Sequence, residues 1–119
     1  MKQTIVSHIG VTKMGILEIQ MRKQLVDGEI THELGFHRVG VVPGGDVELV
    51  LDAVNADLTR MGAGTVSTEE WNEVRTIAAA VWTEPKRQAF ANMLQEQLAA
   101  DAARAAPVEA QLANQEKTA

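Results

Sequence analysis

The stretch ILEIQMRKQLVDGEITHELGFHRV, residues 16–39, decides the fold of this chain. Apolar and polar residues alternate on both sides of Asp27-Gly28, which is typical of strands that bury one face. An Asp-Gly pair between two such runs is a strong hairpin signal, because a type I′ turn requires positive φ angles at both central residues. The stretch therefore predicts a long β-hairpin with Asp27 and Gly28 at the centre of its turn.

This turn would fix the register of the hairpin and separate an apolar face from a polar one. The expected cross-strand pairs include Leu25–Ile30, Met21–Leu34 and Ile19–Phe36. The apolar face then comprises Leu17, Ile19, Met21, Leu25, Ile30, Leu34 and Phe36. On the polar face, the expected ion pairs are Arg22–Glu33 and Glu18–His37. Two strands alone are marginal in water, so either helices of the same chain or other subunits must cover the apolar face.

The residues around the hairpin predict the rest of an α+β fold. Residues 4–11 alternate in the same way and predict a strand that pairs with the edge of the hairpin. Pro43 and two glycines end the sheet. Asp46 is a suitable N-cap for a helix over 47–61, and a capping box at 67–70 predicts the start of a second helix. A third helix is expected from about Glu84. The prediction is an N-terminal antiparallel hairpin or small sheet, followed by two or three C-terminal helices.

We expect a single structural unit with three regions. These are a sheet region over 1–45, a helical region over 46–99 and an Ala/Gln-rich tail over 100–119. The tail has high helix propensity but little apolar surface, and Pro107 is expected to interrupt it. Without a neighbouring subunit to hold it, the tail is expected to fray.

Composition excludes several classes of function. The formal net charge of −5 argues against binding along a phosphate backbone, so we expect no nucleic-acid partner. The chain has no cysteine, which rules out disulfides and thiolate metal sites. It has no apolar run long enough for a transmembrane helix and no segment typical of a signal peptide.

The residues that could bind a metal or a ligand, or act in catalysis, do not form a site that the sequence pattern supports. His32 and His37 are five apart on one strand and point to opposite faces, so they are not expected to share a metal ion. Trp71 has the spacing of a hydrophobic staple with Val66, which favours a place in the core over a ligand site shared with Trp82. An enzyme would require His8, His32 and Glu33 to converge from separate elements. We therefore predict no catalytic site, metal or cofactor.

Three short segments follow one another in a distinctive order. They are Phe36-His37-Arg38, Pro43-Gly44-Gly45-Asp46 and Ile77-Ala78-Ala79-Ala80-Val81-Trp82-Thr83. This order resembles that of small tailed-bacteriophage proteins, in which a long hairpin precedes a Pro-Gly-x-Asp step and an Ala-Val-Trp-Thr step. The similarity covers roughly residues 16–90 and includes no catalytic motif.

The resemblance implies a non-enzymatic structural subunit of a phage virion, in the tail, the tail tip or the attached fibres. Such a protein would be found in the virion and, during assembly, in the host cytoplasm. It would act by packing with itself, as a trimer or hexamer, and with other virion proteins, without a membrane partner. The expected contact residues are Leu17, Ile19, Met21, Leu34 and Phe36. The alternative is a soluble phage accessory protein, either an assembly chaperone or an inhibitor of a host factor.

Overall fold

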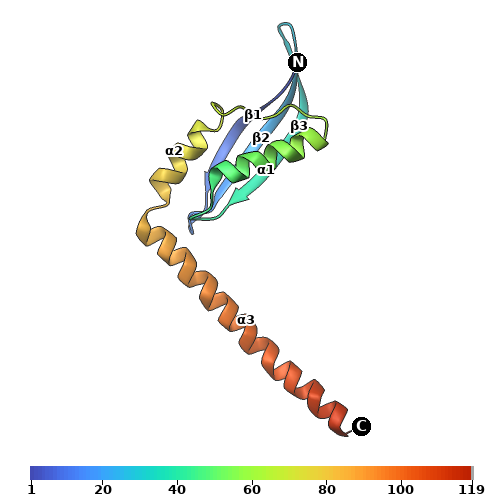
Figure 1. The fold of residues 1–119 in the computed structure, drawn as a ribbon, viewed down its shortest axis with the longest axis vertical. Coiled ribbons are helices and arrows are strands. Elements are labelled where there is room, and N and C mark those ends of the chain that lie inside the picture. The colour runs from blue at the N-terminus through green and yellow to red at the C-terminus, as the bar shows by residue number, and fades with distance from the viewer. Residues whose placement is uncertain (119) are drawn as a thin grey trace. The chain divides into compact units, whose positions relative to one another are not determined.

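The computed structural model describes residues 1–118, with side chains up to Arg104, and confirms the α+β fold. Over these residues the strands are β1 (Lys2–Val11), β2 (Leu17–Asp27) and β3 (Ile30–Val41). The helices are α1 (Val47–Arg60), α2 (Asn72–Val81) and α3 (Glu84–Thr118) (Figure 1). The strands and the first two helices belong to one compact unit, Met1–Arg87, and a second unit begins at Gln88.

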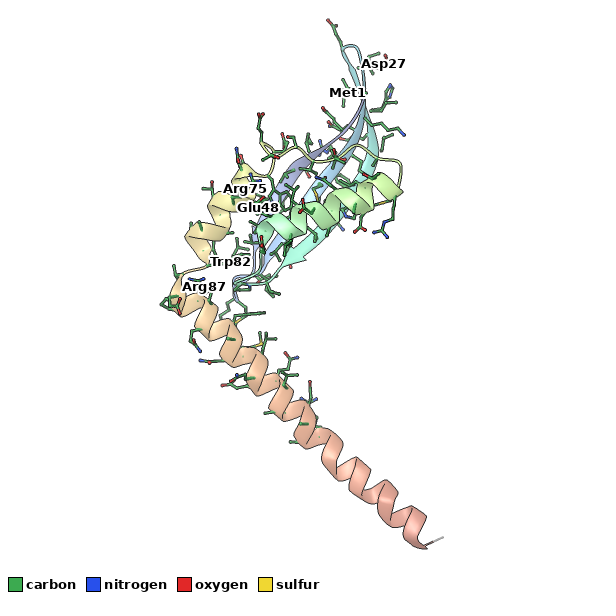
Figure 2. All side chains as sticks on the ribbon, viewed as in Figure 1. Met1, Asp27, Glu48, Arg75, Trp82 and Arg87 are labelled. Atoms are coloured by element: carbon green, nitrogen blue, oxygen red, sulfur yellow. The ribbon has the colours of Figure 1, made fainter. Side chains whose placement is uncertain are left out.

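The strands form an antiparallel sheet in the order β1-β2-β3, so the hairpin strand β2 is central. The prediction that the first strand pairs with the hairpin is confirmed, with Ile9 opposite Ile19 and Val6 opposite Met21. The chain start is held at the hairpin, because the backbone groups of Met1 and Val26 exchange hydrogen bonds of 2.7 Å in both directions. Figure 2 shows Met1 and Asp27 at the same end of the sheet.

The predicted turn is wrong by one position. Asp27 pairs with Ile30, so the loop residues are Gly28 and Glu29. Gly28 has a φ of 61°, and among the described residues only glycines have positive φ. Glycine at the first central position is the requirement of a type II′ turn. That turn spares Asp27 the left-handed conformation which a type I′ turn would impose on it.

The predicted register is also wrong, because the turn is shifted and β3 contains a bulge. Gln24 pairs with Glu33 but Lys23 pairs with Gly35, which leaves Leu34 as the extra residue. Gly35 has a φ of 107°, a conformation that glycine adopts without strain. The observed pairs are Met21–His37, Ile19–Val39, Leu17–Val41, Arg22–Phe36 and Glu18–Gly40. The bulge therefore moves Phe36 to the polar face and separates Glu18 from His37.

Helices of the same chain cover the apolar face of the sheet. Figure 1 shows α1 lying across this face, with α2 beside it. The core consists of Leu17, Ile19, Met21, Val41, Leu51, Val54, Leu58, Val66, Trp71, Val74 and Ala78. The sequence left open whether the cover comes from the same chain or from another subunit, and the structure shows that it comes from the same chain.

The helix starts follow the predicted signals in part. Asp46 caps α1 by accepting hydrogen bonds from the amides of Glu48 and Leu49, at 2.9 and 3.3 Å. Ser67 accepts from the amide of Glu70 at 3.2 Å, but this bond lies in the turn before α2, which begins at Asn72 with Trp71 as its N-cap and no side-chain cap. The carboxylate of Glu70, however, does not reach back to Ser67. It accepts from the amide of Val6 on β1, at 3.1 Å.

Both tryptophans have structural roles within the chain. Trp71 is fully buried with Val66 in the core, which confirms its predicted place, and its indole donates to the carbonyl of Val47 at 2.9 Å. Trp82 is half-buried, and its indole donates to the carbonyl of Gly15 at 2.7 Å.

α3 continues to Thr118, so the predicted interruption at Pro107 is not found. The surrounding alanines and glutamines favour a helix, and their propensity offsets the cost of about 3 kcal/mol for one interior proline. Fraying of this tail in solution stays a prediction.

Candidate functional site

The candidate site is the first part of β3, residues 30–36, which we call the free segment. Every residue of the free segment is exposed, although a strand with one covered face would alternate between buried and exposed residues. Its apolar members are Ile30, 61% exposed, and Leu34 and Phe36, both 46% exposed. Within the described residues, β3 pairs only with β2, so it also offers an unpaired edge. This segment is therefore open on two faces and one edge.

The predicted contact residues do not lie on one surface. Leu17, Ile19 and Met21 are at most 1% exposed and lie beneath the helices of their own chain, so they have no surface left for a partner. Leu34 and Phe36 remain accessible. Unbroken alternation along the hairpin would have placed all five residues on one face. Gly35 within the strand pattern was the signal for the bulge that separates them.

The uncovered face of the sheet carries a charged cluster beside Phe36. The guanidinium of Arg22 lies over the Phe36 ring, with its carbon 5.6 Å from the ring centroid. Its Nη1 lies 3.1 Å from a carboxylate oxygen of Glu33, so the predicted ion pair is confirmed despite the wrong register. Arginine and aromatic side chains are enriched where proteins make energetically important contacts. This cluster makes the free segment chemically suitable for a protein partner.

The uncovered face also has a small hollow of about 110 Å³ near the other end of β3. It is lined by His8, Glu18, Ile19, Gln20 and Arg38. Arg38 donates from Nε to the side-chain oxygen of Gln20 at 3.3 Å. The hollow is too small for a typical small-molecule site, which occupies roughly 300–1,000 Å³.

The residues that an enzyme would require are not brought together. His8 lies opposite Gln20, whereas Glu33 lies opposite Gln24, four residues further along β2. At about 3.3 Å per residue, their backbones are roughly 13 Å apart along the strand. Among the described residues, no three His, Asp or Glu side chains group as metal ligands.

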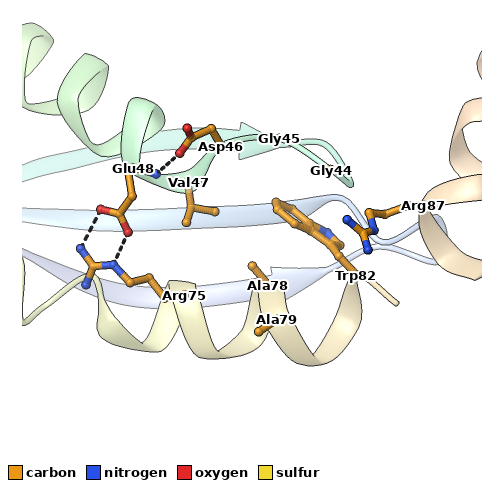
Figure 3. Close-up of a pocket in the computed structure, with 10 residues that line it drawn as sticks. All are labelled: Gly44, Gly45, Asp46, Val47, Glu48, Arg75, Ala78, Ala79, Trp82 and Arg87. Carbon is orange, nitrogen blue, oxygen red and sulfur yellow. Dashed lines mark hydrogen bonds and ion pairs between the residues drawn. The ribbon is translucent and has the colours of Figure 1, made fainter. Parts of the chain in front are cut away.

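A larger, shallow hollow of about 710 Å³ lies at the start of α1 (Figure 3). Its lining residues are Gly44, Gly45, Asp46, Val47, Glu48, Arg75, Ala78, Ala79, Trp82 and Arg87. Its charges are already engaged: Asp46 caps α1, Glu48 pairs with Arg75, and Arg87 lies 3.2 Å from Glu84.

Arg75 acts as a cross-link between α1 and α2. Its Nη2 donates to Glu48 at 2.9 Å, and its Nε pairs with the other carboxylate oxygen (Figure 3). Its Nη1 donates to the carbonyl of Thr68 and to the side-chain oxygen of Asn72, at 2.8 and 2.7 Å. The hydrogen bond from Arg75 holds the pKa of Glu48 below its usual value, and the same bond raises the pKa of Arg75. The hollow is thus a helix junction, whose charged groups bind one another.

No known family, curated protein or solved structure matches this chain. The link to tailed phages therefore stays a prediction from the three short segments. Of the helices formed by the described residues, none has the length and apolar character needed to cross a bilayer.

Proposed function

We propose that this chain is a non-enzymatic structural subunit of a tailed-phage particle, in the tail, the tail tip or the fibres, and that it acts by packing through the free segment. The observation that carries the proposal is the exposure of residues 30–36 on both faces of an edge strand. A long, exposed edge strand with apolar residues is a template for pairing with another chain.

The distribution of apolar side chains supports a binding role for this segment. The chain buries Leu17, Ile19 and Met21 of β2 almost fully, at 0–1% exposure, yet leaves Phe36 on the neighbouring strand at 46%. The guanidinium of Arg22 also lies over one face of the Phe36 ring, which favours one position of the ring before any partner binds. A pre-positioned aromatic ring loses little conformational freedom on binding.

The phage setting comes from the resemblance alone. The exposed free segment supports the idea that the chain acts by packing. The Pro-Gly-Gly-Asp step forms the entry to α1, and the Ala-Val-Trp step ends α2 against Gly15. Both steps therefore build the scaffold that presents the hairpin. This arrangement suits a subunit whose exposed strand makes the contacts.

The test is incorporation of the full chain into particles. A phage encoding the protein is grown with the natural sequence, with Phe36→Asp and with Val11→Asp, and purified virions are analysed by mass spectrometry. Val11 is a matched control, because it is also an apolar strand residue at 46% exposure but lies at the end of β1. We expect the natural chain and the Val11 variant in the particles and loss of the Phe36 variant.

Two results would overturn the proposal. One is absence of the natural chain from virions while it is abundant in the infected cell; a stable host partner recovered with it would then indicate the accessory role. The other is equal incorporation of the Phe36→Asp variant, which would remove the free segment from the assembly contacts.

A further inference from the structure

We infer that the free edge of β3 pairs with β3 of a second copy of this chain, antiparallel, to form one continuous sheet with three strands from each copy. This inference rests on the proposed packing function and names its partner. Four features of the described unit carry it: the state of the two sheet edges, the direction of the backbone groups, the charge order along β3 and the position of its side chains.

The two edges of the sheet are treated differently by the rest of the chain. The segment after α1 covers the β1 edge: the Thr4 hydroxyl donates to the carbonyl of Gly64 at 2.6 Å, and the Lys2 ammonium donates to the carbonyl of Gly62 at 2.7 Å. The amide of Val6, which points away from β2, donates to the carboxylate of Glu70. β3 has no strand neighbour other than β2 within residues 1–118. Pairing between copies is therefore directed to β3.

The hydrogen-bonding pattern places the backbone groups of Glu33 and Arg38 on the free edge. Val26 exchanges backbone hydrogen bonds with Met1, so even-numbered β2 residues bond β1 and odd-numbered ones bond β3. Glu33 and Arg38 lie opposite Gln24 and Gln20, whose backbone groups bond β1. The backbone groups of Glu33 and Arg38 therefore point away from β2, to the free edge. The bulge between Glu33 and Arg38 changes the parity, which is why an odd and an even residue point outward together.

The charges along β3 favour antiparallel pairing with itself. Near neutral pH, the charged residues of β3 are Glu33 in its first half and Arg38 in its second half, and Glu29 lies in the turn just before the strand. Antiparallel pairing sets the acidic part of one copy against the basic part of the other, whereas parallel pairing would oppose like charges. An interface that joins identical strands in this way has two-fold symmetry, so each charge contact occurs twice.

The side chains agree with a register in which Glu33 faces Arg38 of the other copy. Both residues are on the uncovered face, because each lies opposite a β2 residue of that face. Glu33 binds Arg22 through one carboxylate oxygen and Arg38 binds Gln20 through Nε, which leaves the second oxygen and the terminal nitrogens for each other. The same register brings Leu34 and Phe36 to the centre of the interface. A two-fold pairing is compatible with a hexamer that contains two-fold axes, but not with a trimer alone.

The test is a charge exchange in the full chain, read by sedimentation equilibrium over a range of concentrations. The variants are Glu33→Arg, Arg38→Glu and an equimolar mixture of the two. Each single variant opposes like charges at both contacts, and we expect its dimer dissociation constant to rise about tenfold or more. In the mixture, one chain carries two arginines and the other two glutamates. Both contacts are then attractive, and association should return to the natural level.

Glu18→Arg is the control, because it reverses a charge on the same face but on the central strand β2. It should leave the dissociation constant unchanged. Because Glu33→Arg also removes the ion pair with Arg22, thermal unfolding of each variant checks that the monomer remains folded. Recovery in the mixture cannot arise from damaged monomers.

Three results would overturn the inference: a natural chain that stays monomeric at all concentrations, single variants that associate normally, or a mixture that does not recover. If the natural chain enters virions but shows any of these results, the particle role stands and β3 binds a different protein. If the charge exchange behaves as expected but the chain is absent from virions, the self-association stands and the proposed function fails.

Discussion

The sheet of this protein has two contrasting parts. The covered side is the face beneath the helices together with the β1 edge, and the free side is residues 30–36 of β3. On the covered side, the helices bury Ile19 and Met21, and the segment after α1 bonds the β1 edge through Gly64. On the free side, residues 30–36 of β3 are exposed throughout, although they carry Ile30, Leu34 and Phe36. The same hairpin thus contributes one strand to the buried core of the chain and, under our proposal, the other strand to contact with a partner.

A covered strand and an exposed strand can therefore come from similar sequence patterns. Both hairpin strands alternate apolar and polar residues, but one additional residue in β3 changes which side chains reach the core. On the covered side, substitutions should lower the free energy of unfolding. On the free side, they should change association and leave unfolding almost unaffected.

The largest difference is expected between Met21→Ala and Phe36→Ala. Met21 is fully buried, so its truncation should lower the free energy of unfolding by about 2–5 kcal/mol. Phe36 is half exposed and lies outside the buried core, so its truncation should cost only about 0.5 kcal/mol or slightly more. Urea unfolding followed by circular dichroism measures both. Similar losses for the two variants would contradict the division into sides.

A smaller effect on stability is expected from adding a side chain at Gly64, which lies against the β1 edge. A Cβ at Gly64 would clash with the backbone of Lys2 and lie 2.6 Å from the Cα of Gln3. Backbone atoms cannot move aside cheaply, so Gly64→Ala should cost about 1–3 kcal/mol. Gly10→Ala is the matched control, because its Cβ would come no closer than 3.6 Å to any side chain. Thermal melting of the two variants should separate them clearly.

Removing one hydrogen bond at the covered edge should cost less. Thr4 is 2% exposed and its hydroxyl donates to the carbonyl of Gly64, so Thr4→Val leaves a partly buried acceptor without its donor. We expect a loss of about 1–2 kcal/mol in the free energy of unfolding. Thr31→Val, in the exposed free segment, should have almost no effect. Equal behaviour of the two threonines in chemical denaturation would argue that this edge is not held by the hydroxyl.

The smallest effect concerns pH and lies at the junction of α1 and α2, on the covered side. The hydrogen bond from Arg75 lowers the pKa of Glu48 in the folded state. The unfolded chain therefore takes up a proton first as the pH falls. The stabilisation is complete above the ordinary glutamate pKa and is lost as the pH drops through the lower, folded-state pKa.

Glu48→Gln should flatten this part of the pH–stability curve by a small amount, because the pair is exposed. Melting temperatures of the natural chain and the variant between pH 3 and pH 7, on the scale of ordinary carboxyl titration, make the comparison. If the melting temperature of the variant changes with pH as steeply as that of the natural chain, other carboxylates cause this dependence.

Local patterns predicted much of this fold. Period-two alternation located the strands, and Asp46 marked the start of α1 because a cap needs only its own neighbouring amides. Trp71 was placed in the core from its spacing to Val66. The ion pair between Arg22 and Glu33 survived a wrong register because long side chains reach diagonal neighbours across strands.

The candidate site could be predicted only in part. Leu34 and Phe36 were named as contact residues and are exposed, but they were grouped with Leu17, Ile19 and Met21, which are buried. The error came from the turn and the bulge. Gly28 and Gly35 each permit more than one local conformation, so the choice depends on which pairing buries more apolar surface elsewhere.

The types and order of the elements, the Asp46 cap of α1 and the amphipathic strands could be predicted from the sequence alone, because these depend on interactions between residues close in the chain. The register, the covering of one sheet face by helices and the exposure of residues 30–36 follow from the tertiary structure. Those features depend on contacts between segments far apart in the chain, such as β1 with Gly64 and β2 with α1. Such contacts are set by packing, which no single stretch of sequence contains.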